Sequence, residues 1–173
     1  LTDRCNLRCL YCHSNARHQC IPHEKVLRYE EMLRLVRIVR GMGVGKVRLT
    51  GGEPFARKGC DDFLLRLRQR FDDLDIRITT NGTLLEEKRE ILLNAPALHK
   101  VNISLHAFEA NDLSVPFETY LSRCFSFGQA AEAKFLVVYR LWNGGGAEQR
   151  NPEILSAMER AFPAPWDVQP RGT

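Results

Sequence analysis

The sequence predicts an α/β protein in which a parallel sheet is covered by helices. Segments rich in apolar and β-branched residues alternate with amphipathic segments of helical period along all 173 residues. Strands that are separated by helices pair in parallel, because each helical crossover returns the chain to the same end of the sheet. The motifs "TGGEP", "TTNG" and "SLHAF" each lie at the carboxyl end of a predicted strand, and ligands bind at that end of parallel sheets.

The first long helix is predicted over residues 29–43. Its arginines fall on the side opposite to its apolar residues, and Gly41 or Gly43 ends it. The apolar stripe consists of Tyr29, Met32, Leu33, Val36, Val39 and Met42. This pattern is typical of a helix that packs against a sheet.

Four strand–helix pairs follow. The strands are expected at 46–50, 75–82, 100–108 and 134–141, and the helices at 60–71, 86–96, 116–133 and 151–162. In the last helix, Asn151 is the expected N-cap and Pro152 the first helical residue. With a short strand at residues 1–4, this count fits an incomplete barrel or an open sheet better than a closed eightfold barrel.

Composition and charge exclude several classes of protein. The formal net charge is +4 and the arginines are scattered over helices, so charge gives no support for nucleic-acid binding. No apolar run is long enough to span a membrane, and six cysteines in this context do not resemble a secreted disulfide framework. We expect a cytoplasmic protein. We also expect truncation at both ends, because Leu1 runs almost directly into a cysteine motif.

That motif, "DRCNLRCLYC", places Cys5, Cys9 and Cys12 within eight residues. Thiolates bind zinc or iron–sulfur clusters, and structural zinc requires four ligands. A fourth zinc ligand could come from Cys20, or from His13, His18 or His23, so a zinc-binding structural or interaction module remains an alternative. A four-iron cluster held by three cysteines instead keeps one iron open to a small molecule.

A second motif, "RLTGGEP" at residues 48–54, accompanies "CNLRCLYC". Together they resemble the radical S-adenosylmethionine (radical SAM) superfamily, nearest in motif to its molybdenum-cofactor GTP-cyclising branch. The resemblance implies a single core domain over 1–173 with a partial (β/α)6 barrel. It also implies a radical SAM enzyme that uses a [4Fe–4S] cluster to cleave S-adenosylmethionine to a 5′-deoxyadenosyl radical, which abstracts hydrogen from an unidentified substrate. A flavodoxin- or ferredoxin-like protein would donate the electron.

The resemblance also implies the residues of the site. The cluster ligands would be Cys5, Cys9 and Cys12, and the contacts to S-adenosylmethionine would come from Tyr11, Gly51, Gly52, Glu53, Pro54 and Ser104. The two glycines can adopt backbone angles closed to other residues and allow a close approach to the ligand. The carboxylate of Glu53 could then accept hydrogen bonds from the ligand's ammonium group.

Further residues extend or depart from the resemblance. Arg48 and Thr80 would face the substrate. The stretch "HSNARHQC" and His106 differ from the GTP-cyclising branch, so the substrate stays open. Alternation along the predicted strand places His106 on the same face as Ser104, and we interpret His106 as a structural histidine.

Overall fold

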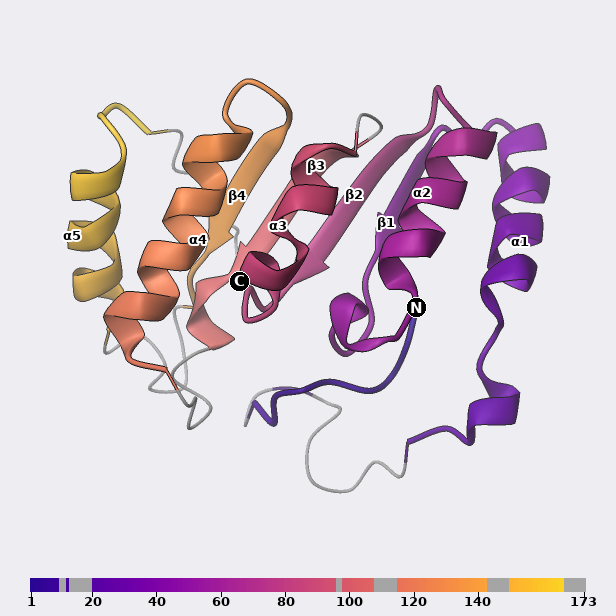
Figure 1. Cartoon of the computed structure of the whole chain (residues 1–173), viewed down its shortest axis with the longest axis horizontal. Coiled ribbons are helices and arrows are strands. Elements are labelled where there is room, and N and C mark those ends of the chain that lie inside the picture. The colour runs from indigo at the N-terminus through magenta and orange to yellow at the C-terminus, as the bar shows by residue number, and fades with distance from the viewer. Residues whose placement is uncertain (10–11, 13–19, 96–97, 108–114, 143–149, 167–173) are drawn as a thin grey trace.

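The protein folds around one parallel sheet with the strand order β1-β2-β3-β4 (Figure 1). A computed structural model describes residues 1–9, 12, 20–95, 98–107, 115–142 and 150–166. The strands are β1 (Lys46–Leu49), β2 (Asp75–Thr80), β3 (Leu98–Ser104) and β4 (Leu136–Arg140). The helices are α1 (Tyr29–Gly41), α2 (Cys60–Arg70), α3 (Leu85–Leu93), α4 (Phe117–Ala131) and α5 (Asn151–Ala161), with single 3-10 turns η1 (His23–Lys25), η2 (Pro54–Ala56) and η3 (Leu105–Ala107). The predicted α/β class and the parallel sheet are confirmed.

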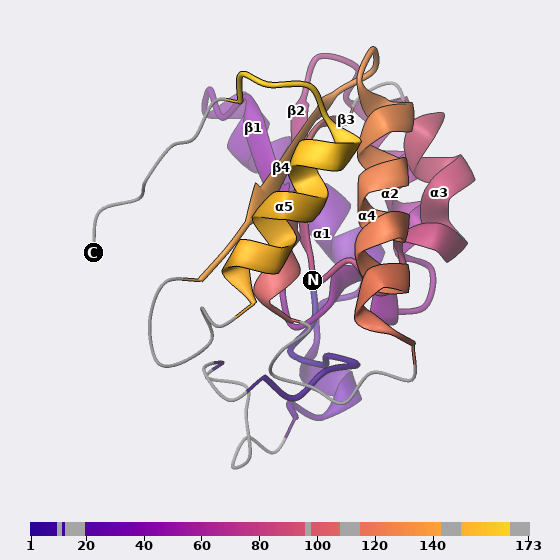
Figure 2. The same ribbon diagram turned by 90° about the vertical axis from the view of Figure 1, so that its left-hand side faces the viewer.

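The core lies between the sheet and the helices on one of its faces. Figure 2 shows α2, α3 and α4 on the same side of the strands. The register aligns Leu49, Ile78 and Val101 across the first three strands, and all three side chains are buried. Burial of this apolar row against the helices is what the strand periodicity predicted.

The opposite face of the sheet carries a basic row. The register places Arg48 opposite Arg77, and Arg77 opposite Lys100. The same row continues to Leu136 on β4, whose side chain is 56% exposed. Because side chains alternate along a strand, this row points away from α2, α3 and α4.

Two predicted strands differ from the structure. Residues 1–4 form no strand, although two of their carbonyl groups accept hydrogen bonds from Gly52 and Glu53. β1 ends at Leu49, and Gly52 and Glu53 belong to the loop that follows it. Residues 1–4 therefore have no neighbouring strand with which to form a β-ladder. β3 ends at Ser104 and the chain turns into η3, which breaks the alternation expected between Ser104 and His106.

Two details of the predicted helices also differ. The last helix begins one residue earlier than predicted, with Arg150 as N-cap and Asn151 inside the first turn. Met42 lies just beyond α1 and is 78% exposed, so it does not continue the apolar stripe. Helical spacing holds only as far as the helix itself, and α1 ends at Gly41.

Candidate cofactor site

The candidate site lies at the carboxyl ends of the strands, where the N-terminal segment crosses the loop after β1. The backbone N–H of Gly52 donates to the carbonyl of Thr2 (2.7 Å), and that of Glu53 donates to the carbonyl of Arg4 (3.0 Å). Figure 1 shows the indigo N-terminal segment passing along this end of the sheet. The crossing brings the start of the cysteine loop against "TGGEP".

Gly51 and Gly52 are required by this crossing. A Cβ atom on Gly51 would collide with the carbonyl oxygen of Thr2, and one on Gly52 with the carbonyl group of Arg4. Neither glycine has a positive φ, since the positive values belong to Gly43, Gly59 and Gly82. The expected special backbone angles are therefore wrong for this pair. The missing side chains make room for the segment that leads into Cys5.

Glu53 lies beneath this crossing and is completely buried. Its Oε1 accepts hydrogen bonds from the hydroxyl of Thr80 (2.9 Å) and the backbone N–H of Phe55 (3.2 Å), and its Oε2 accepts from the backbone N–H of Asn81 (2.7 Å). Burial raises the pKa of Glu53, while these donors favour its charged form. The carboxylate therefore serves to join the loops after β1 and β2, and no part of it is exposed to a ligand. Thr80, predicted to face the substrate, is buried in this contact.

The three cysteines of the motif lie in one loop with unequal exposure. Cys5 and Cys9 are half-buried, Cys12 is exposed, and the backbone N–H of Cys12 donates to the carbonyl of Cys9 (3.1 Å). Burial raises the pKa of the Cys5 thiol, and hydrogen bonds from Leu7 and Asn81 oppose this shift. Within the described residues, no three His, Cys, Asp or Glu side chains are already arranged to hold a metal ion.

Several predicted ligands lie outside the described residues. These are Tyr11, expected at the nucleotide, and His13 and His18, considered as zinc ligands. Cys20 is described and exposed. The donor set still fits a cluster chemically, because three thiol groups come from eight residues of the chain and thiolates are the ligands that iron–sulfur clusters use.

A hydrogen-bonded ring beside Cys5 was not predicted from the sequence. The side-chain amide of Asn81 donates to Oδ1 of Asn6 (2.9 Å), and the amide of Asn6 donates to Oγ1 of Thr83 (2.8 Å). The hydroxyl of Thr83 closes the ring by donating to Oδ1 of Asn81 (2.7 Å). The positions of two residues in the sequence could have indicated this ring. Asn6 lies in the cysteine loop, and Asn81 follows a strand whose end faces that loop.

Ser104 and His106 lie further along the same edge of the sheet. Nδ1 of His106 is 3.1 Å from the carbonyl oxygen of Arg140, and its ring lies 5.8 Å from that of Trp142. Burial lowers the pKa of His106. These contacts agree with a structural histidine. Ser104 is partly exposed at the end of β3, as its predicted role requires.

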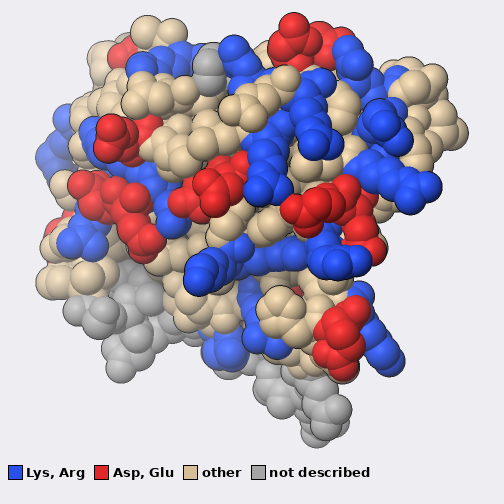
Figure 3. All heavy atoms as spheres, turned by 45° about the vertical axis from the view of Figure 1, so that its right-hand side comes forward, with Lys and Arg blue, Asp and Glu red and all other residues tan. Residues whose placement is uncertain are grey.

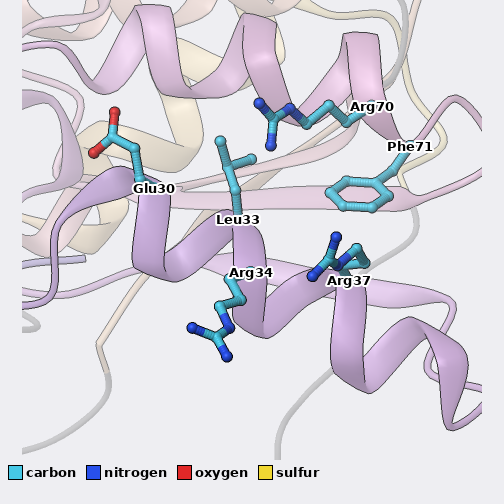
Figure 4. A pocket seen from close by; sticks show the side chains of 6 residues that line it. All are labelled: Glu30, Leu33, Arg34, Arg37, Arg70 and Phe71. Carbon is cyan, nitrogen blue, oxygen red and sulfur yellow. The ribbon is translucent and has the colours of Figure 1, made fainter.

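A pocket of about 420 Å³ lies elsewhere, between α1 and α2 (Figure 4). It is lined by Glu30, Leu33, Arg34, Arg37, Arg70 and Phe71. Arg70 and Phe71 lie at the end of α2, which leads back to the amino end of β2, so the pocket is remote from the cysteine loop. On the face in Figure 3, Lys and Arg side chains alternate with Asp and Glu. This mixture is typical of a solvated surface.

The fold and the paired motifs define a class of protein. Residues 1–124 match the family described as the Radical SAM superfamily, and the chain belongs to that superfamily. Its two predicted cofactors, a [4Fe–4S] cluster and S-adenosylmethionine, are thereby confirmed as those of the family. Among the described residues, no helix is long and apolar enough to cross a membrane.

Curated relatives carry the name GTP 3′,8-cyclase. The chain is 46% identical over 109 residues to the enzyme of Nautilia profundicola, which covers 63% of this chain and 34% of that protein. It is 41% identical over 138 residues to the enzyme of Syntrophomonas wolfei, which covers 78% of this chain and 40% of that protein. The chain thus spans between a third and two fifths of the length of these two relatives.

Solved structures share the fold at low sequence identity. Streptococcus suis SuiB bound to S-adenosylmethionine superposes with a TM-score of 0.68 at 19% identity, over 92% of this chain and 36% of SuiB. BtrN in complex with AdoMet and 2-DOIA superposes with a TM-score of 0.56 at 18% identity, over 80% of this chain and 54% of BtrN. These likenesses agree with the expected partial barrel.

Proposed function

We propose that Cys5, Cys9 and Cys12 hold a [4Fe–4S] cluster whose fourth iron binds S-adenosylmethionine. The observation that supports this proposal is the crossing of the two motifs, in which residues 2–5 pack directly on Gly51 and Gly52. When reduced, such a cluster would supply one electron to S-adenosylmethionine, whose S–C5′ bond would break to give methionine and the 5′-deoxyadenosyl radical. The protein holds and orients the ligand and excludes water.

The chain's own residues then have distinct roles. Tyr11, Gly51, Gly52, Pro54 and Ser104 are proposed to contact S-adenosylmethionine. For Glu53 we propose a positioning role, since its buried carboxylate already accepts three hydrogen bonds. Its effect on the ligand passes through the backbone of the loop, whose shape those bonds fix.

For the substrate we propose GTP, the compound named in the relatives' activity. The basic row of Arg48, Arg77 and Lys100 supports an anionic substrate, because it lies on the sheet face that α2, α3 and α4 leave uncovered. Arg48 is exposed and forms no ion pair within the described part of the chain, whereas Arg77 forms a salt bridge with Asp75 (2.7 Å). Arg48 is thus the better candidate for a phosphate contact.

Anaerobic reconstitution tests the cofactor assignment. Iron and sulfide should give a brown protein with four irons per chain, and Cys5→Ala, Cys9→Ala and Cys12→Ala should each remove them. Cys20→Ala is the matched control, because a zinc module would use Cys20 or a nearby histidine as its fourth ligand. Colourless protein that retains one zinc per chain would instead support the structural module.

Turnover tests the activity. With dithionite in place of the proposed flavodoxin- or ferredoxin-like donor, the loaded protein should convert S-adenosylmethionine to 5′-deoxyadenosine. GTP should accelerate this conversion more than ATP does. No 5′-deoxyadenosine from fully loaded protein would contradict the proposed activity, whereas equal rates with both nucleotides would contradict only the substrate. A cytoplasmic location and a single core domain over 1–173 remain predictions.

A further inference from the structure

The side chain of Asn81 lies where it can donate to a cluster ligand. Its Nδ2 is 3.8 Å from Sγ of Cys5 and 2.9 Å from Oδ1 of Asn6. A primary amide has two N–H groups, so one can serve each acceptor. The backbone N–H of Leu7 also donates to Sγ of Cys5, at 3.4 Å. The sulfur of Cys5 therefore accepts from two N–H groups, while its own thiol donates to Oδ1 of Asn6 at 4.0 Å.

The orientation of the Asn81 amide follows from its partners. Oδ1 of Asn81 is 3.0 Å from the backbone N–H of Thr83, a group that can only donate. The atom facing Thr83 must therefore be the oxygen, which directs Nδ2 to Asn6 and Cys5. The directions around the Asn81–Asn6–Thr83 ring are mutually consistent, and each hydrogen bond polarises the next.

The backbone of Asn81 is fixed on both sides. Its N–H donates to Glu53 at 2.7 Å, and its carbonyl accepts from the hydroxyl of Tyr120 at 2.7 Å. Glu53 and Tyr120 are both buried, and Asn81 itself is 8% exposed. An amide held in this way has little freedom to turn away from the sulfur.

We propose that Asn81 is a positioning residue that donates a hydrogen bond to the Cys5 thiolate and thereby raises the reduction potential of the bound cluster. Reduction adds negative charge to the cluster and its sulfur ligands, and an N–H donor stabilises that charge. The proposal rests on the proposed function, because it requires a cluster ligated by Cys5. The cluster would accept its electron more readily with Asn81 than without it.

A redox titration of the reconstituted chain, followed by EPR, tests this proposal. Asn81→Ala should retain iron and shift the midpoint potential to a more negative value. Asn102→Ala is the matched control, since Asn102 is also buried but donates to the carbonyl of Ile78 within the sheet, and its potential should equal that of the wild type. An unshifted potential in iron-loaded Asn81→Ala protein would overturn the proposal, as would an equal shift in the control.

A second variant decides the case if Asn81→Ala does not fold or loses iron. Thr83→Ala keeps the Asn81 amide and opens only the ring, so it should lower the potential in the same direction by a smaller amount. An unchanged potential in that variant would then overturn the proposal. A wild-type chain that assembles no cluster would instead overturn the proposed function on which it rests, so the two failures are distinguishable.

Discussion

The backbone N–H of Asn81 donates a 2.7 Å hydrogen bond to Oε2 of Glu53, and this bond joins the turn after β2 to the loop after β1. The same two loops also contact the N-terminal segment, Glu53 through its N–H to Arg4 and Asn81 through its amide to Asn6. Glu53 and Asn81 therefore connect the cysteine loop with the sheet. The geometry of the candidate site depends on this buried pair.

Glu53→Gln should destabilise the folded protein by about 1–3 kcal/mol. The NH2 group of glutamine would face an N–H donor and could not accept its hydrogen bond, so that donor would be buried without a partner. Two of the three donors are backbone groups, which cannot reverse their direction. Urea denaturation followed by circular dichroism measures the free energy of unfolding. Glu159→Gln, at an exposed position of α5, is the control and should leave that energy unchanged. Equal stability of the two variants would show that the buried carboxylate is not needed.

Gly52→Ala should displace residues 2–5 and cost about 1–3 kcal/mol of stability, because the new methyl group meets backbone atoms that cannot move aside as a side chain can. The affected atoms include the backbone nitrogen of Cys5, so iron retained after reconstitution should fall as well. Gly45→Ala is the control, since a Cβ atom there has no neighbour within 4 Å. Full iron content and wild-type stability in Gly52→Ala would disprove the close crossing.

The sequence predicted the elements better than it predicted the contacts between them. Strand and helix periodicity is local, so β2, α2 and α4 lie close to their expected positions. The atoms that require Gly51 and Gly52 belong to residues 2–5, and such a long-range contact leaves no local pattern. For the same reason, the sequence indicated Asn81 only as part of the motif "TTNG" at the end of a strand. Its role becomes visible once the ends of the strands are placed against the cysteine loop.

The stability of the protein should decrease below about pH 6.5 through His106. Burial, together with the charge of Arg140, lowers the pKa of this histidine in the folded state. Below the ordinary value of 6.5 the unfolded chain takes up a proton that the folded chain does not, so unfolding is favoured as the pH falls toward the lowered pKa. The contribution is complete above pH 6.5.

His106→Gln isolates this effect, because glutamine does not titrate. The difference in free energy of unfolding between wild type and variant should be constant from about pH 7 to 8 and should change between about pH 6.5 and 5, with the wild type losing more stability. Urea denaturation followed by tryptophan fluorescence measures both proteins across the range. Parallel curves down to about pH 5 would exclude a titration of His106 coupled to folding.

Arg48→Met should weaken GTP binding to the loaded protein by about tenfold, the loss expected when one charge-assisted hydrogen bond of about 1.4 kcal/mol is removed. Arg48 lies opposite Arg77 on the sheet face that α2, α3 and α4 leave uncovered, and because the guanidinium of Arg77 is already paired with Asp75, a phosphate group placed there would meet the charge of Arg48. Methionine keeps most of the length of the side chain and removes the charge together with the N–H donors. Binding measured by calorimetry should also weaken with salt, because the contact is ionic.

Arg34→Met provides the matched control for this loss of charge. Arg34 lines the remote pocket on α1, so the net charge changes equally while the proposed substrate face stays intact (Figure 4). Both variants should retain full iron, and Arg34→Met should bind GTP as the wild type does. Equal weakening in the two variants would indicate that overall charge, rather than the sheet face, attracts the nucleotide. Unchanged affinity in Arg48→Met would remove this arginine from the substrate site.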